Sequence, residues 1–160
     1  MFTAIPATEE AARTKQQKAD HLKHIISQQL GSPYVLRPDL HGSLGEMRLM
    51  VFVRSTHVDN IWNCEFKTQT TGLLGGRLPN KGGLVAKLLY KQTSLCFVCT
   101  HLEAHEGFGH CQGRNEMARR VQEGARLGDV QLDLGNQFDH VFWAGDLNYR
   151  VDLARFKGDM

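Results

Sequence analysis

Hydrophobic residues recur along the chain at two different spacings, and the first of these predicts helices. Residues 9–30 open with acidic residues, contain good helix formers throughout and end before Gly31. Their apolar side chains lie at helical spacing: Leu22, Ile25, Ile26 and Leu30. Because this stripe occupies only the second half, we expect a helix whose first half is exposed. Residues 114–129 predict a second helix.

The second spacing is that of strands, in runs of apolar, β-branched and aromatic residues. These runs occupy residues 47–55, 61–70, 84–90, 93–102 and 140–148. The first run is apolar on both faces, so we expect it in the centre of a sheet. The second alternates and suits a strand with one wet face, whereas the last is apolar on both faces and needs covering layers. Only Lys91 and Gln92 separate the third run from the fourth, which predicts a hairpin.

Two segments rich in glycine predict loops between these elements. Residues 31–46 hold two prolines and three glycines, and we expect a loop there with one short strand at 34–36. Residues 71–83 hold five glycines and one proline. The order of helix, several strands, helix and strand predicts an α/β layered protein, and the sequence shows no internal domain boundary.

Composition narrows the class of protein but does not identify an activity. The chain has 160 residues, of which 41% are hydrophobic and 22% charged, as in ordinary globular domains. A net charge of +2 gives no support for a nucleic-acid partner. The N-terminus lacks the apolar core of a signal peptide, and no apolar run reaches membrane-spanning length. We therefore expect a cytoplasmic protein without a transmembrane segment, for which peripheral membrane contact remains open.

The four cysteines do not form a pattern that indicates disulfides in a chain of this length. Cys96 and Cys99 make a C-x-x-C within a predicted strand. Side chains three positions apart on a strand face opposite ways, so these two thiols are poor joint metal ligands. We expect buried, reduced thiols.

The end of the last predicted strand, "FWAGDLNYR", combines apolar and polar residues. We expect the strand to break at Gly145, and Asp146 and Asn148, two positions apart, to share one face. A carboxylate can hold a divalent metal or orient a water, and an amide can donate to an anionic oxygen. An Asx turn that closes the strand explains the same residues equally well.

Three further motifs carry polar groups, and each has a structural explanation of its own. His101 ends a strand and His105 follows it, where satisfied core histidines are more common than catalytic ones. Asn80 and Lys81 precede two glycines, which suits a phosphate, although a solvated lysine in a hairpin fits too and the order is not that of a Walker A motif. In "QGRNEM", Arg114 and Asn115 are expected to open a helix, with Asn115 as its cap.

Taken together and in this order, the motifs resemble the inositol polyphosphate 5-phosphatases, a family of the DNase I-like endonuclease/exonuclease/phosphatase superfamily. The family signature W-x-G-D-x-N-[FY]-R is matched by Trp143, Gly145, Asp146, Asn148, Tyr149 and Arg150. "NKGG", "HLEAH" and "GRNE" precede it, and the resemblance extends from about residue 47 to 153. It implies a fold of two sheets packed face to face with outer helices, of which about half is present here. The implied activity is Mg²⁺-dependent hydrolysis of the 5-phosphate of phosphoinositides or inositol polyphosphates.

The resemblance also implies roles for individual residues. Asp146 would orient or activate the attacking water close to the metal, and is a candidate Mg²⁺ ligand. Asn148 would bind the scissile phosphate, and His101 would stabilise the pentavalent transition state. The residues assigned to the substrate side are Asn80, Lys81, His105 and Arg150, the last of which either contacts substrate or braces the loop.

Several family motifs do not occur in the chain. The Q-E motif that supplies the main metal-binding glutamate does not precede the first helix, and Glu9 and Glu10 do not replace it. The later C-D-R and Asp-His motifs are missing as well. We therefore expect residues 1–160 to be a partial catalytic domain that is inactive in isolation and exposes apolar surface. The alternatives are a phosphodiesterase or nuclease of the same superfold and a non-catalytic remnant.

Overall fold

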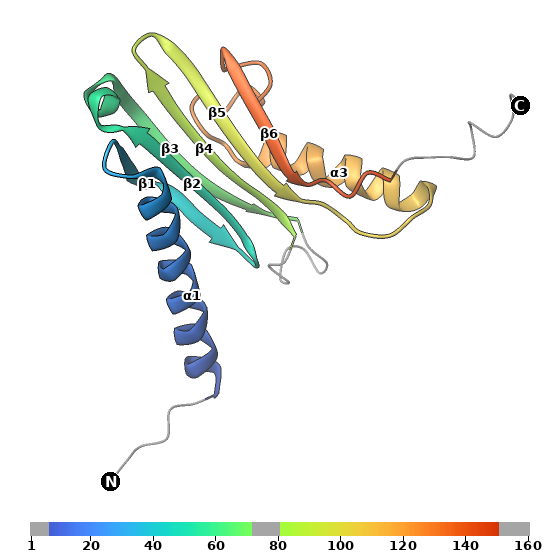
Figure 1. Cartoon of the computed structure of the whole chain (residues 1–160). Coiled ribbons are helices and arrows are strands. Elements are labelled where there is room, and N and C mark those ends of the chain that lie inside the picture. Colours follow the sequence, from blue (N-terminus) through green and yellow to red (C-terminus); the bar gives the residue numbers. More distant parts are fainter. Residues whose placement is uncertain (1–6, 72–80, 151–160) are drawn as a thin grey trace, which may run out of the picture. The chain divides into compact units, whose positions relative to one another are not determined.

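The computed structural model describes residues 7–71 and 81–150 (Figure 1). The chain divides into two units. The first unit comprises Met1–Leu36 and Phe52–Val58, and the second comprises Arg37–Val51 and Asp59–Met160. Two strands, β1 and β2, contribute to both units. The predicted site residues that the structure describes all belong to the second unit.

The first unit contains helix α1, Ala7–Leu30, which confirms the first predicted helix and starts two residues earlier. The helix stops where the sequence predicts, because Gly31 adopts φ 75° and donates its N–H to the Ser27 carbonyl at 3.0 Å. Its apolar stripe remains partly exposed, with Ile25 41% accessible. A 3₁₀ helix, η1 (Ser55–Asn60), follows β2.

The prediction of a loop over residues 31–46 is wrong, because most of this segment forms strand β1, Tyr34–Leu44. β1 pairs with β2, Met47–Arg54, in a two-stranded sheet, so β2 is not the central strand that its apolar sequence predicted. A proline is tolerated in a two-stranded sheet, where each strand has an unpaired edge. Gly42 interrupts the apolar pattern because the Phe66 ring packs against it, and a Cβ there would lie 2.5 Å from that ring.

The second unit is built on a four-stranded sheet in the order β3-β4-β5-β6. Its strands are β3 (Ile61–Thr70), β4 (Gly82–Tyr90), β5 (Thr93–His101) and β6 (His140–Asp146). β3, β4 and β5 are antiparallel neighbours, whereas β6 lies parallel to β5. The predicted hairpin at "KQ" is confirmed, with Lys91 at φ 54°.

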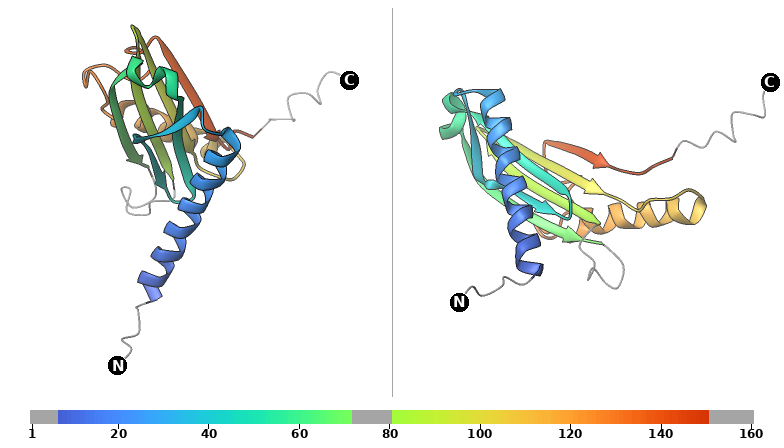
Figure 2. Two further views of the ribbon diagram at one scale, coloured as in Figure 1. Left: turned by 60° about the vertical axis from the view of Figure 1, so that its left-hand side comes forward. Right: turned by 60° about the horizontal axis from the view of Figure 1, so that its bottom comes forward.

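Helix α3, Phe108–Gly124, covers one face of this sheet, and parts of β1 and β2 cover the other (Figure 2). On the helix side the buried cluster consists of Val85, Cys96, Val98, Val121, Ala125, Leu127 and Leu134. On the opposite side Leu40, Ala86 and Leu88 are buried, with Leu49 and Val51 packed against them. The unit therefore has three layers, which confirms the predicted layered α/β class.

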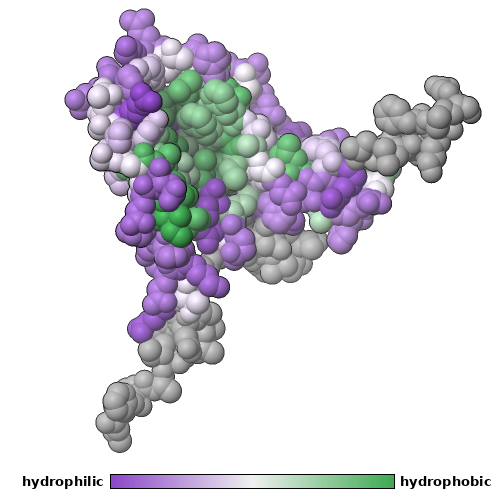
Figure 3. Space-filling view, viewed as in Figure 1, coloured by the Kyte–Doolittle hydropathy of each residue, from purple (hydrophilic) through white to green (hydrophobic). Residues whose placement is uncertain are grey.

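β6 is the edge strand of the sheet, and one of its faces is only partly covered. Phe142 stacks on Phe97 with ring centroids 5.3 Å apart, yet remains 53% exposed. Figure 3 shows hydrophobic surface gathered over the sheet in this view. The last strand is therefore apolar on both faces, as its sequence indicated, but lies at an edge.

Helix α3 starts earlier than predicted and ends before residue 129. Gly107, at φ 105°, precedes its first residue, so Arg114 and Asn115 lie inside the helix rather than at its opening. The capping role expected for Asn115 is therefore wrong. The glycines in "FGHCQG" obscured the first two turns, although Gly109 and Gly113 both fit within the helix.

The prediction of buried thiols is confirmed for Cys96 alone, since Cys64, Cys99 and Cys111 are only partly buried. All four are free, and Cys96 and Cys99 face opposite sides of the sheet. Cys96 is fully buried under α3, and this burial raises the pKa of its thiol to about 12. The Sγ of Cys99 lies 3.9 Å from the carbonyl of Arg48, on the side that β2 covers.

Candidate functional site

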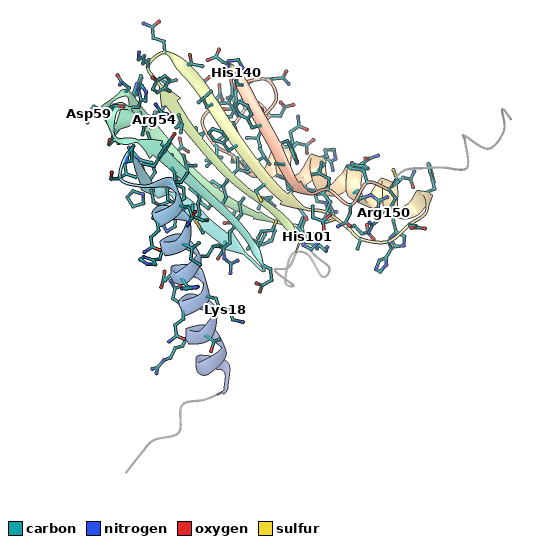
Figure 4. All side chains as sticks on the ribbon, in the orientation of Figure 1. Lys18, Arg54, Asp59, His101, His140 and Arg150 are labelled. Carbon is teal, nitrogen blue, oxygen red and sulfur yellow. The ribbon has the colours of Figure 1, made fainter. Side chains whose placement is uncertain are left out.

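Three strands of the second unit bring polar residues to one end of its sheet. The first residue of β4, Gly82, is paired with His101 at the end of β5, which is paired in turn with Asp146 at the end of β6. Figure 4 shows His101 and Arg150 at this end, with His140 at the opposite end of β6. Residues far apart in the sequence therefore meet where the motifs predicted a site.

The strand does not break at Gly145, contrary to the sequence prediction. Gly145 lies within β6, is paired with Thr100 and adopts φ 121°. A Cβ at this position would lie 2.1 Å from the carbonyl oxygen of Thr100, so only glycine allows the two strands to approach this closely. Trp143 reinforces the contact, since its Nε1 donates to the buried Thr100 Oγ1 at 2.9 Å.

A turn, rather than a shared strand face, brings Asp146 and Asn148 together. Asn148 has φ 53°, outside the strand region, and its backbone N–H donates to Asp146 Oδ1 at 3.2 Å. This is the Asx-turn contact. The turn is also tied to β5, because Leu102 donates its N–H to the Asp146 carbonyl at 3.0 Å and accepts from Asn148 Nδ2 at 3.1 Å. The Asx turn therefore holds both side chains at the end of the sheet.

The central contact of the site joins a lysine to a histidine. Lys81 Nζ lies 2.5 Å from His101 Nε2, and Asp146 Oδ2 lies 3.5 Å from the same nitrogen. Since an ammonium group can only donate, Nε2 accepts and the neutral ring carries its proton on Nδ1. The side chains of His101 and Asp146 are 35% and 63% exposed, so a ligand can reach them.

The charges of this group change its protonation. Burial lowers the pKa of His101, the positive charge of Lys81 lowers it further, and Asp146 opposes both effects. Burial also lowers the pKa of Lys81, while the carboxylates of Asp146 and Glu103 act in the opposite direction. His101 therefore favours its neutral form more strongly than a free histidine does.

Replacing Lys81 by methionine is expected to raise the pKa of His101, because one of its two lowering causes is removed while Asp146 remains. The measurement is an NMR titration of the His101 ring protons in the purified chain. Lys91→Met, in the β4–β5 hairpin, is the matched control and should leave that pKa unchanged. Equal His101 titration curves in wild type and Lys81→Met would contradict the assigned contact.

The remaining candidates differ in how the structure places them. Arg150 Nη2 donates to Asn148 Oδ1 at 3.0 Å. This contact braces the loop, which is one of the two roles expected for Arg150; the other was contact with substrate. His105 is exposed at φ 81°, and its ring lies 5.3 Å from that of His110. Its substrate role stays a prediction. Asn80 lies outside the described residues.

Sequence reasoning missed how helix α3 supports the site. Arg114 is 2% exposed and donates to the backbone after β5, and Asn115 accepts from the hydroxyl of Tyr149 at 2.5 Å. One signal could have shown this, because Arg114 lies on the buried stripe of α3 together with Met117 and Val121. An arginine on such a stripe needs specific partners.

Comparison with known proteins identifies the family. Residues 2–159 match the model of the endonuclease/exonuclease/phosphatase family 2. Among curated proteins, the chain is 33% identical over 149 residues to phosphatidylinositol 3,4,5-trisphosphate 5-phosphatase 2B of Danio rerio, covering 91% of this chain. It is 37% identical over 108 residues to human synaptojanin-1, covering 66% of this chain.

A solved structure supports the same assignment. It is the inositol polyphosphate 5-phosphatase domain of SPsynaptojanin in complex with inositol (1,4)-bisphosphate and calcium ion. The match has a TM-score of 0.69 and 27% identity and covers 98% of this chain, which confirms the DNase I-like fold. The chain spans 42% of that domain, and 12% and 6% of the two curated relatives. The chain thus belongs to the endonuclease/exonuclease/phosphatase family 2, and the relatives it resembles are inositol polyphosphate 5-phosphatases.

Proposed function

We propose that this site takes part in hydrolysis of the 5-phosphate of phosphoinositides or inositol polyphosphates, within a longer catalytic domain to which residues 1–160 contribute. The observation that carries the proposal is the meeting of Lys81, His101 and Asp146 at one end of the sheet. The solved relative was crystallised with inositol (1,4)-bisphosphate, which is inositol 1,4,5-trisphosphate without its 5-phosphate. That ligand supports a phosphate monoester as the substrate class.

The residues at the site can divide the work of phosphoryl transfer between them. Asp146 can orient the attacking water, since its Oδ1 is fixed by the turn and its side chain is 63% exposed. An amide nitrogen has two hydrogens, and the Leu102 carbonyl takes one from Asn148, so the second can donate to a phosphate oxygen. The ammonium of Lys81 can neutralise negative charge that develops on the phosphate.

His101 has a defined part in this scheme. Its Nε2 accepts from Lys81, which aims the ammonium at the space beside Asp146. The lowered pKa keeps the ring neutral, so this acceptor remains available near neutral pH. A protonated His101 ring would repel the ammonium of Lys81 and displace it from the site.

We propose Mg²⁺ as the metal ion of the reaction, with Asp146 as one oxygen ligand of the type that Mg²⁺ prefers. Within residues 7–71 and 81–150, no group of three or more His, Cys, Asp or Glu side chains could hold a metal ion. The described residues therefore do not complete a magnesium site, and none of the steps above uses the ion. The calcium ion of the solved relative belongs to that protein.

The cellular setting is proposed from the substrate class. Among the described residues, no helix is long and apolar enough to cross a bilayer. We propose a cytoplasmic location with peripheral contact to a membrane when the substrate is a phosphoinositide. A nucleic-acid partner is not proposed, since the net charge of +2 provides no strong electrostatic attraction.

The 160-residue chain on its own is expected to release no measurable inorganic phosphate from inositol 1,4,5-trisphosphate with Mg²⁺. The reason is that the described residues supply only part of the charge stabilisation that the transition state needs. A phosphate assay against an enzyme-free blank measures this, with an active synaptojanin domain as the positive control. Mg²⁺-dependent turnover by the purified chain would contradict the expectation.

The function itself is tested on the product of the complete transcript that encodes this chain. If that product contains the Q-E, C-D-R and Asp-His motifs, we expect it to release phosphate from inositol 1,4,5-trisphosphate. A phosphodiester such as bis-p-nitrophenyl phosphate serves as the comparison substrate. A product that cleaves only the diester would overturn the proposal in favour of a phosphodiesterase of the same superfold. A product that has all motifs and cleaves neither would make the chain a non-catalytic relative.

A further inference from the structure

Arg114 is a buried cation on the face of helix α3 that packs into the second unit. Its side chain is 2% exposed, on the same stripe as the buried residues Met117 and Val121. Burial of a guanidinium is costly unless its N–H groups find partners. Within the described structure its Nε is buried without a hydrogen-bond partner, so the position is held at some cost in stability.

Arg114 makes hydrogen bonds to the backbone that follows β5, next to the site. Its Nη1 donates to the carbonyl of His105 at 2.8 Å and lies 3.4 Å from the carbonyl of Glu103. Both carbonyls belong to the segment that follows β5 and His101. A buried cation that donates to backbone carbonyls fixes the course of that segment.

The same side chain also contacts the turn that follows β6. The guanidinium carbon lies 5.5 Å from the centre of the Tyr149 ring, within the range of a cation–π interaction. The next residue of the helix, Asn115, accepts from the Tyr149 hydroxyl at 2.5 Å. Two consecutive helix residues therefore hold the turn that contains Asn148.

These two segments are the ones that carry the proposed site. His101 immediately precedes the first, and Asp146 and Asn148 belong to the second. They are joined directly by the contacts of Leu102 with the Asp146 carbonyl and the Asn148 amide. Arg114 lies behind this junction and contacts both sides of it.

We propose that Arg114 is a positioning residue that sets the spacing between His101 and the Asp146–Asn148 turn. The proposal rests on the proposed function for its catalytic meaning, but its structural content can be tested separately. A lysine cannot replace Arg114. A planar guanidinium can donate to carbonyls at its edge while its face lies over an aromatic ring, and an ammonium group has no such plane.

The test compares Arg114→Met and Arg114→Lys with Arg120→Met in the purified full chain. Arg120 is on the same helix, 52% exposed and paired with Glu116, so it controls for loss of a cation from α3. Hydrogen exchange followed by NMR reports on the amides of Leu102 and Asn148. We expect their exchange to become at least about tenfold faster in both Arg114 variants and unchanged in Arg120→Met.

The amides of Val85 and Val98, in the centre of β4 and β5, distinguish positioning from general destabilisation. If Arg114 only positions the two segments, the exchange of these two amides should stay the same in all variants. If its loss destabilises the whole unit, exchange should become faster across the sheet. Uniform acceleration, or no change at Leu102 and Asn148, would overturn the proposal.

A second measurement separates this inference from the proposed function. Titration with inositol (1,4)-bisphosphate, followed through the ring signals of His101, gives the affinity of each variant. We expect weaker binding by Arg114→Met than by wild type and equal binding by Arg120→Met. If wild type binds nothing, residues 1–160 do not form the phosphate site without the rest of the longer domain, while the exchange data still decide whether Arg114 holds the two segments.

Discussion

Replacing Gly145 by alanine is expected to lower the free energy of unfolding by about 3–5 kcal/mol, the range of severe single substitutions. The new Cβ would lie 2.1 Å from the carbonyl oxygen of Thr100, a backbone atom that cannot move without separating β5 from β6. The positive φ of 121° adds strain for any residue with a side chain. Urea unfolding of the purified chain measures the effect.

Gly109→Ala is the matched control for this substitution. Gly109 lies in the first turn of α3, and a Cβ there would have no atom within 4 Å. Alanine should therefore be neutral or stabilise the helix by up to about 1 kcal/mol. If the Gly145 and Gly109 variants unfold at the same urea concentration as wild type, the close approach of β6 to β5 is not tight in solution.

Asp146→Asn is expected to lower phosphate release by about 10³-fold or more in the longer protein that carries the complete set of motifs. Asparagine keeps an oxygen that can accept from the Asn148 N–H, so the turn should survive. What is removed is the negative charge that faces His101 at 3.5 Å and that orients the water in the proposed reaction. Initial rates of phosphate release at saturating substrate measure the loss.

Asp139→Asn provides the comparison for this variant, because it removes a carboxylate beside the start of β6 at the far end of the strand. Asp139 Oδ2 accepts from the backbone and hydroxyl of Ser94, so its loss can affect stability but not the site. Both variants should retain the fold by circular dichroism. Retention of more than a tenth of the wild-type rate by Asp146→Asn would remove Asp146 from the catalytic role.

Much of the sheet could be predicted because its strands have strong local patterns. The runs that became β3, β4, β5 and β6 are rich in apolar residues, and a two-residue connection specifies the β4–β5 hairpin. β1 was missed because its proline and glycines indicate loops when read locally. Only the tertiary contact explains one of them, since Gly42 makes room for the ring of Phe66.

The site was predicted as a set of residues but not as a geometry. The motifs indicated Asp146, Asn148 and His101. Strand pairing brings Asp146 to His101, and the turn after β6 places Asn148 at the same end of the sheet. The periodicity argument for Asp146 and Asn148 was wrong, because a residue at positive φ leaves the strand conformation. The Lys81–His101 contact was not predicted, because it depends on the side-chain conformations at this end of β4 and β5, which sequence patterns do not specify.

The parallel pairing of β6 with β5 has a consequence for the order of folding. β3, β4 and β5 are connected as antiparallel neighbours along the chain, whereas β6 reaches its place only after the chain has passed through α3. Closing that long connection costs chain entropy before any strand contact repays it. We therefore expect the hairpins to form early and β6 to join last. The hairpins would then be folded before the site exists, because Asp146 meets His101 only when β6 pairs with β5 in the final step of folding.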